Sequence, residues 1–232
     1  LYANNHVDNL KQAILGVFGT EKLKSLALML LSSRLFSIES DTFDLDRFWL
    51  QSLATAQISE DIGKTGIWGK QLGSNLYFVG LFYDLGSLFI AHCLPEQSRQ
   101  IKNEMQSDFS LLQYHDFQIN RLGISSPQVS AFLASYWNLP AHLTIELRAL
   151  SQSYKNADTF TPSCIGITCV ASAVHEYLTA KNDLASVKKE FGAILKQSFF
   201  DFGLSWTDQI ESLSQNLESR IESLRSQASE LT

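Results

Sequence analysis

We expect an all-α protein, because apolar residues recur at helical spacing along almost all of the 232-residue chain. No alternating β-branched run is joined to another by an Asn-Gly or Asp-Gly turn, and only four prolines interrupt the chain. With 45% hydrophobic and 18% charged residues, the composition is that of a globular protein with enough chain for one core and a helical extension. The sequence therefore predicts a multi-helix bundle.

Three helices are expected in the first hundred residues. The first two follow Thr20 and Asp44, which are residue types that cap helix N-termini, and a third is expected from about 74 to 93. The third is apolar on nearly every side, so it should be the central buried helix, with Gly80 and Gly86 permitting close approach of another backbone. The apolar stripes of the first two are Leu23, Leu26, Ala27, Leu30 and Leu31, and then Leu45, Phe48, Trp49, Leu53 and Ala56.

Prolines mark three further helix starts, at Ser126-Pro127, at Pro140 and at Thr161-Pro162. After these, a helix containing Val187 to Leu195 should end near Gly203. In the helix that starts at Ser126, the residues expected on one apolar face are Val129, Phe132, Leu133, Tyr136 and Trp137.

The segment 206–231 carries a separate apolar stripe at alternating three- and four-residue spacing, with one stutter. Two interpretations stay open: the helix folds back on its own domain, or it mediates a homodimer or leads into another domain. The stripe consists of Ile210, Leu213, Leu217, Ile221, Leu224, Ala228 and Leu231.

Charge and composition exclude several classes of protein. A formal net charge of −6 lacks the basic excess that nucleic-acid phosphates require. No run approaches the roughly 18 consecutive apolar residues of a membrane-spanning helix, so no membrane association is expected. Cys93, Cys164 and Cys169 fit neither a zinc motif nor a disulfide framework, and we expect reduced core thiols and a cytoplasmic protein.

Four segments in order carry a family resemblance: FWLQSLATA at 48–56, VGLFYDLG at 79–86, LGISSPQV at 122–129 and WNLP at 137–140. Together they resemble the HDOD domain, a helical relative of the HD phosphohydrolases. The resemblance implies an HD-like helical fold over residues 1–153, with helices in 154–232 packed on it or mediating association. Because residues 2–14 resemble the middle of the domain and Leu1 is not methionine, we expect a fragment that lacks earlier helices.

The resemblance also implies that the metal site is degenerate. Catalytic HD proteins hold a hydrolytic metal with a histidine, a His-Asp pair and further ligands. Here Gln51 stands for the first histidine, Tyr83-Asp84 stands for the His-Asp pair, and Ser126 stands where many relatives carry histidine. Only Asp84 is retained, so we expect no metal, no other cofactor and no catalytic residue.

His115-Asp116 is a literal His-Asp dipeptide, but it lies in LQYHDF and lacks the Gly-Leu-Phe context of the motif, so we interpret it as a coincidence. The remaining histidines, among them His175, show no i, i+4 pairing of ligands and are expected to be surface or satisfied residues. Gly-Lys-Thr at 63–65 lacks the upstream glycine and strand of a phosphate loop.

These observations favour a non-catalytic regulatory module of bacterial signal transduction that acts through protein–protein interaction. Its expected partner is another protein or an attached signalling domain. Two alternatives stay open. One is a metal-dependent phosphohydrolase with an atypical site, such as Asp84 with His115 and Asp116, and the other is a sensor that binds a nucleotide without turnover.

Overall fold

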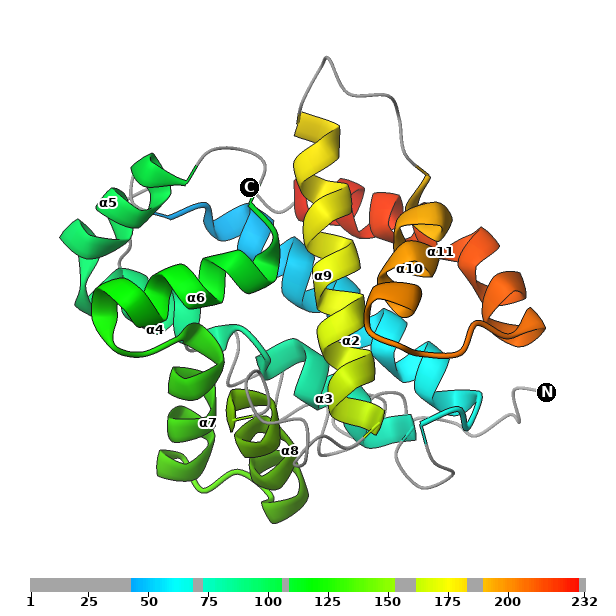
Figure 1. The fold of residues 1–232 in the computed structure, drawn as a ribbon, viewed down its shortest axis with the longest axis horizontal. Helices are drawn as coiled ribbons and strands as arrows, with labels where there is room; N and C mark the ends of the chain where they lie inside the picture. Colours follow the sequence, from blue (N-terminus) through cyan, green and yellow to red (C-terminus); the bar gives the residue numbers. More distant parts are fainter. Residues whose placement is uncertain (1–42, 69–72, 106–108, 153–161, 183–189, 230–232) are drawn as a thin grey trace, which may run out of the picture. The chain divides into compact units, whose positions relative to one another are not determined.

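The computed structural model describes residues 43–68, 73–105, 109–152, 162–182 and 190–229 (Figure 1). All of them belong to one compact unit, Ile38–Thr232. The described residues form α-helices and no strand, which confirms the predicted all-α fold. The helices are α2 (Leu45–Lys64), α3 (Gly73–Phe82), α4 (Leu85–Cys93), α5 (Pro95–Glu104), α6 (Leu111–Leu122), α7 (Ser126–Tyr136), α8 (Ala141–Gln152), α9 (Pro162–Asn182), α10 (Phe191–Asp201) and α11 (Asp208–Ser229).

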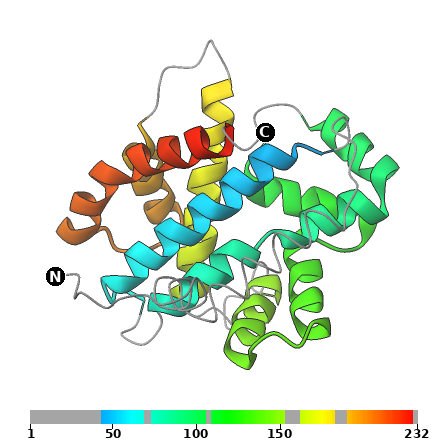
Figure 2. The ribbon, with the colours of Figure 1, turned by 180° about the vertical axis from the view of Figure 1, so that it is seen from behind.

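Helix α2 lies at the centre of this arrangement, with α3, α9 and α11 packed against it (Figures 1 and 2). It begins where the sequence predicts, because the Asp44 carboxylate accepts a hydrogen bond from the Arg47 backbone N–H at 2.9 Å. Leu50, Ala54 and Ile58 are buried although they are not part of the predicted apolar stripe. They are buried because α3, α9 and α11 all pack against α2. The helix predicted after Thr20 lies outside the described residues.

The single helix predicted from about 74 to 93 is wrong: α3 ends at Phe82 and α4 begins at Leu85. Asp84 has φ −112° and ψ 18°, outside the helical region. The Gly86 N–H donates to Ser130 Oγ on α7 at 2.8 Å, and not to a carbonyl of the preceding turn. Packing against α7 therefore interrupts the helix at the Tyr83-Asp84 pair.

An 18-residue window, Leu76–Cys93, is apolar enough to cross a membrane, with a mean hydropathy of 1.4. It spans the broken α3–α4 segment, and 72% of it is buried inside the protein. A segment buried in the core of a protein can have the same length and apolar composition as a membrane-spanning helix.

The glycines of this segment allow the close approach that the sequence predicts. A Cβ on Gly80 would lie 3.0 Å from the Ala56 Cα of α2, and one on Gly86 would lie 2.0 Å from the Ser126 carbonyl oxygen of α7. Two pairs of helices therefore meet backbone to backbone beside Asp84.

Helix α7 starts at Ser126 as predicted, but its predicted apolar face is partly wrong. Val129 and Leu133 are buried, whereas Phe132 and Tyr136 are 62% and 72% exposed. The two exposed rings stack on one another with centroids 6.1 Å apart. Burial on α7 follows the sides that α4 and α8 cover, which the helical period alone does not determine.

The C-terminal helices pack onto the same unit. Helix α10 ends at Asp201, and Gly203 follows with φ +67°, which agrees with the predicted stop. In α11, Ile210, Leu217 and Ile221 are buried, and α11 packs against α2 and α10. The described part of the stripe therefore packs within its own unit through these three side chains.

The prediction of three core thiols needs a correction. Cys164 and Cys169 are buried, as expected, and burial raises the pKa of the Cys169 thiol to about 12. Cys93 is exposed, because it is the last residue of α4, where the chain turns into α5.

Candidate functional site

Three of the four positions predicted to mark the degenerate metal site come together around Asp84. Asp84 lies at the break between α3 and α4, Gln51 lies on α2, and Ser126 is the first residue of α7. Asp84 and Gln51 line one cavity, and Ser126 contacts Asp84 directly. Tyr83 is 4% exposed and belongs to the core instead.

The Asp84 carboxylate is held by hydroxyl groups. Its Oδ1 accepts hydrogen bonds from Ser126 Oγ and from Ser87 Oγ, the latter at 2.9 Å. Because a carboxylate oxygen has two lone pairs, these two donors account for the hydrogen-bonding capacity of Oδ1. Ser126 therefore stabilises the carboxylate of Asp84.

His115 lies next to Asp84, whereas from the sequence we interpreted its dipeptide as a coincidence and placed it with Asp84 only in the phosphohydrolase alternative. It is 3% exposed, and its Nε2 lies 3.6 Å from Asp84 Oδ1, beyond hydrogen-bond distance. Its ring also packs against that of Tyr83, with centroids 5.7 Å apart. The dipeptide does lack the family context, but tertiary packing brings its histidine to the retained aspartate.

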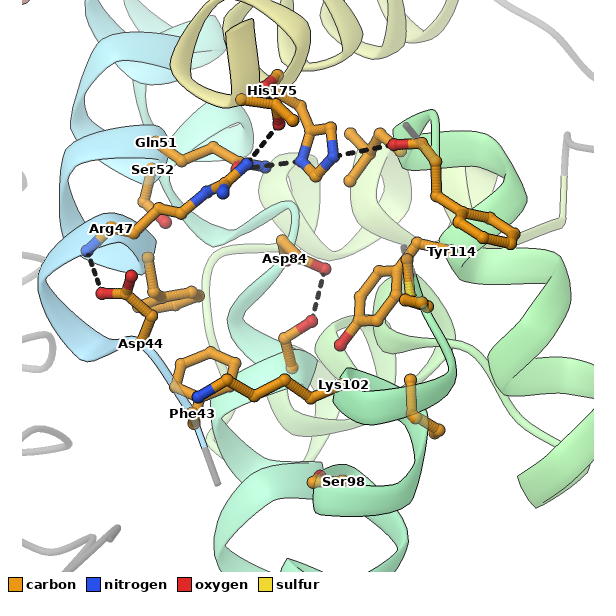
Figure 3. Close-up of a pocket in the computed structure, with 17 residues that line it drawn as sticks. Phe43, Asp44, Arg47, Gln51, Ser52, Asp84, Ser98, Lys102, Tyr114 and His175 are labelled. Atoms are coloured by element: carbon orange, nitrogen blue, oxygen red, sulfur yellow. Dashed lines mark hydrogen bonds between the residues drawn. The ribbon is translucent and has the colours of Figure 1, made fainter. Parts of the chain in front are cut away.

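His175 is a site residue that sequence reasoning missed, since the sequence indicated only a surface or satisfied histidine. It projects from α9 into the cavity (Figure 3), where Nδ1 contacts the Gln51 amide at 3.3 Å and Nε2 contacts the Phe109 carbonyl at 3.2 Å. Burial, and secondarily the nearby Arg47 charge, lower the pKa of His175 to about 4. His175 is therefore a neutral imidazole at pH 7.

The neutral imidazole settles how its two neighbours bind it. One N–H is available, and the Phe109 carbonyl can only accept, so Nε2 carries the hydrogen. Nδ1 is then an acceptor that faces Gln51 Oε1, and exchanging the oxygen and nitrogen of the Gln51 amide would let its NH2 group donate to Nδ1. Gln51 on α2 thus contacts an imidazole from the distant helix α9.

The cavity has a volume of about 530 Å³, within the range of roughly 300–1,000 Å³ typical of small-molecule sites. Helices α2, α4, α5, α6 and α9 and the Met105 and Phe109 side chains surround it. Figure 3 shows Arg47 and Tyr114 on opposite sides of it. Burial, and secondarily the Asp84 charge, raise the pKa of the Tyr114 phenol, which stays protonated. The cavity is therefore partly polar and partly aromatic.

These residues do not fit the metal centre of catalytic HD proteins. No three His, Cys, Asp or Glu side chains of the described residues lie close enough together to hold a metal ion. Asp84 is bonded to hydroxyls, and the amide at Gln51 is a weaker metal ligand than imidazole. The arrangement can bind and orient a small molecule, but it offers no set of ligands for a hydrolytic metal.

We expect stability to fall as the pH drops from about 6.5 to 4, because His175 must be neutral in the fold. Its pKa is about 4 in the folded chain and 6.5 when unperturbed, so the unfolded chain binds more protons between these values. The contribution is complete above pH 6.5 and is lost toward pH 4, with a slope of up to about 1.4 kcal/mol per pH unit.

Urea denaturation at a series of pH values measures this slope. His175→Gln should remove the part of the pH dependence of stability that His175 contributes. His142→Gln, at an exposed histidine of α8, should leave that pH dependence unchanged. Identical profiles for the wild type and His175→Gln would contradict a neutral imidazole at this position.

Comparisons with known proteins agree with the fold. A structure from Shewanella amazonensis named "Putative phosphohydrolase" aligns with a TM-score of 0.68 and 16% identity, over 98% of this chain and 78% of that one. An HDOD domain protein with unknown function from Geobacter sulfurreducens aligns with a TM-score of 0.63 and 19% identity, over 100% and 77%. The MmoQ response regulator from Methylococcus capsulatus aligns with a TM-score of 0.50 and 16% identity, over 88% and 73%.

At these identities the structural neighbours show the fold alone, and a search of the curated proteins found no match. The family assignment comes from the sequence. The HDOD domain model matches residues 1–152, well over half of the chain. The helical fold and the motifs at 48–56, 79–86, 122–129 and 137–140 agree with that match, and the chain belongs to the HDOD domain family.

Proposed function

We propose that this HDOD domain is a non-catalytic regulatory module of bacterial signal transduction, acting in the cytoplasm through contact with another protein or an attached domain. The observation that carries the proposal is the Asp84 carboxylate, which is bonded to Ser126 and Ser87 at the place where a catalytic relative would bind its metal. Because the described residues include no group of three His, Cys, Asp or Glu side chains that could hold a metal ion, this part of the chain offers no metal site to activate water for hydrolysis.

Two further observations support a signalling role. The similarity in fold to a chain named as a response regulator places this architecture in at least one signalling protein. On the surface of α7 and α8, Phe132, Tyr136 and Ile145 are each more than 60% exposed, and exposed apolar side chains of this size are typical of contact surfaces.

We also propose the division into an HDOD core, 1–153, and C-terminal helices, 154–232, of which α9 and α11 pack on α2.

Metal analysis and a hydrolysis assay test the non-catalytic role. We expect protein purified without chelator to carry no stoichiometric transition metal and to hydrolyse no phosphodiester or nucleotide. Asp84→Asn is the matched control, because its amide oxygen can still accept from Ser126 and Ser87 while the charge needed to bind a metal is lost. Turnover by the wild type that Asp84→Asn removes would overturn the proposal.

Cross-linking in the source organism tests the interaction role. A specific partner should be recovered with the wild type and with Asp84→Asn alike, since the contact requires no chemistry at Asp84. Recovery that depends on Asp84 would instead indicate that the site itself takes part in the output.

A further inference from the structure

The cavity beside Asp84 is lined by the guanidinium of Arg47, whose positive charge no carboxylate of the described residues pairs with. Arg47 lies in the first turn of α2, is partly buried, and lines the cavity. Its Nη2 donates to Thr179 Oγ1 on α9, and a hydroxyl cannot neutralise a guanidinium charge. Burial lowers the pKa of Arg47, whereas the Asp44 charge raises it, which shows that desolvation of the cation outweighs its local compensation.

The Asp44 carboxylate is not positioned to satisfy this cation. Asp44 caps α2 by accepting from the Arg47 backbone N–H, and no carboxylate of the described residues forms an ion pair with the guanidinium. A guanidinium has five N–H donors in a planar fork that matches a carboxylate. The remaining donors of Arg47 therefore suit an anionic group that enters the cavity.

The charges of the cavity lining limit what that anion can be. Arg47 and Lys102 are cationic, and Asp44 and Asp84 are anionic, so the described residues of the lining carry no net charge. A multiply charged phosphate would meet the two carboxylates without a matching excess of cations. A single carboxylate needs only one guanidinium, so the electrostatics favour a monoanion over a phosphate ester.

The other walls suit an apolar or aromatic body. Phe43 and Phe48 lie near Arg47 with ring centroids 5.5 Å apart, and Phe109 and Tyr114 line the cavity as well. Figure 3 shows the Phe43 ring and the Tyr114 phenol facing the same space as Arg47. Aromatic walls around a small number of polar groups are the usual composition of a site for an organic ligand.

We propose that this cavity binds an organic monocarboxylate with an apolar or aromatic body, whose carboxylate is held by Arg47. The inference rests on the proposed non-catalytic function and deepens it, because the ligand is bound without turnover and serves as the signal. The neutral His175 and the Tyr114 hydroxyl supply uncharged hydrogen-bonding groups beside the ligand. Binding would join α2 to α6 and α9 across the cavity, which couples occupancy to the packing of the core.

Isothermal titration calorimetry on the full chain tests this assignment with phenylacetate, hydrocinnamate and phenylbutyrate as probes. The matched neutral ligand is hydrocinnamamide, which keeps the ring and the chain but lacks the charge. We expect at least one acid to bind, and hydrocinnamate to bind at least about tenfold more tightly than its amide. Arg47→Gln should abolish this preference, whereas Arg148→Gln, an exposed arginine on α8 outside the cavity, should retain it.

A second variant keeps the test decisive if Arg47→Gln does not fold. Ser98 lines the cavity from α5, and Ser98→Trp should fill the space and abolish binding of the acids. Equal affinity for acid and amide, no binding of any acid at roughly millimolar concentration, or tighter binding of inorganic phosphate or adenosine monophosphate would each overturn the inference.

The two proposals fail separately. Loss of carboxylate binding with no hydrolytic turnover removes only the ligand assignment and leaves the non-catalytic role intact. Turnover that depends on Asp84 removes the non-catalytic role, whatever the carboxylates do.

Discussion

Gly86→Ala is expected to lower the free energy of unfolding by about 3 kcal/mol or more. The added Cβ would lie 2.0 Å from the Ser126 carbonyl oxygen and 2.8 Å from Val129 Cβ. The first of these atoms is backbone, so no side-chain rotation relieves the clash, and α4 and α7 must separate. That movement would also lengthen the hydrogen bond from the Gly86 N–H to Ser130 and the contact of Ser126 with Asp84. Urea denaturation followed by circular dichroism measures the loss.

Gly192→Ala is the matched control for this substitution. A Cβ at Gly192 would meet the Ser214 side chain, with Oγ at 3.4 Å and Cβ at 3.7 Å, which are ordinary contacts. Since alanine is a better helix former than glycine, this variant should be unchanged or more stable by up to about 1 kcal/mol. A Gly86→Ala variant as stable as the wild type would contradict the close approach of α4 and α7.

Leu217→Ala is expected to lower the free energy of unfolding by about 2–5 kcal/mol, the usual cost of removing a buried leucine side chain. Leu217 is 1% exposed on the side of α11 that packs in its own unit. Two polar contacts attach the same helix at other points. The Tyr177 hydroxyl on α9 donates to Glu222 at 3.1 Å, and Arg220 forms an ion pair with Asp61 on α2. The loss should therefore be the same at every protein concentration, because the contact lies within one chain.

Chemical denaturation at two widely separated protein concentrations checks that expectation. Gln215→Ala changes an exposed residue of the same helix and should alter stability by no more than about 0.5 kcal/mol. A midpoint for the wild type that rises with protein concentration would support the alternative in which 206–231 mediates a homodimer.

Several features of the site could be read from the sequence because they depend on local chemistry. Asp44 caps α2, and Gly80 and Gly86 permit contacts that a side chain would prevent. The family motif singled out both Asp84 and Ser126, and the structure brings them into contact, but the motif did not show that the serine donates to the aspartate. Tyr83 and Asp84 are adjacent in sequence, yet one lies in the core and the other lines the cavity.

The contributions of α6 and α9 could not be predicted in the same way. His115 and His175 are 31 and 91 residues from Asp84 in the chain, and nothing in LQYHDF or around His175 marks them as neighbours of the motif. The exposure of Phe132 and Tyr136 was likewise missed, because an aromatic residue at helical spacing is ordinarily expected to be buried.

The sequence by itself determined the helical class, the Asp44 cap and the family, since each depends on neighbouring residues or a short motif. Only the tertiary structure decided that the 74–93 segment breaks at Asp84, that α11 folds back on α2, and that a cavity opens beside Arg47 and His175. The physical reason is that helical periodicity defines the faces of one helix, whereas the neighbour that covers each face is selected by packing among distant segments of the chain.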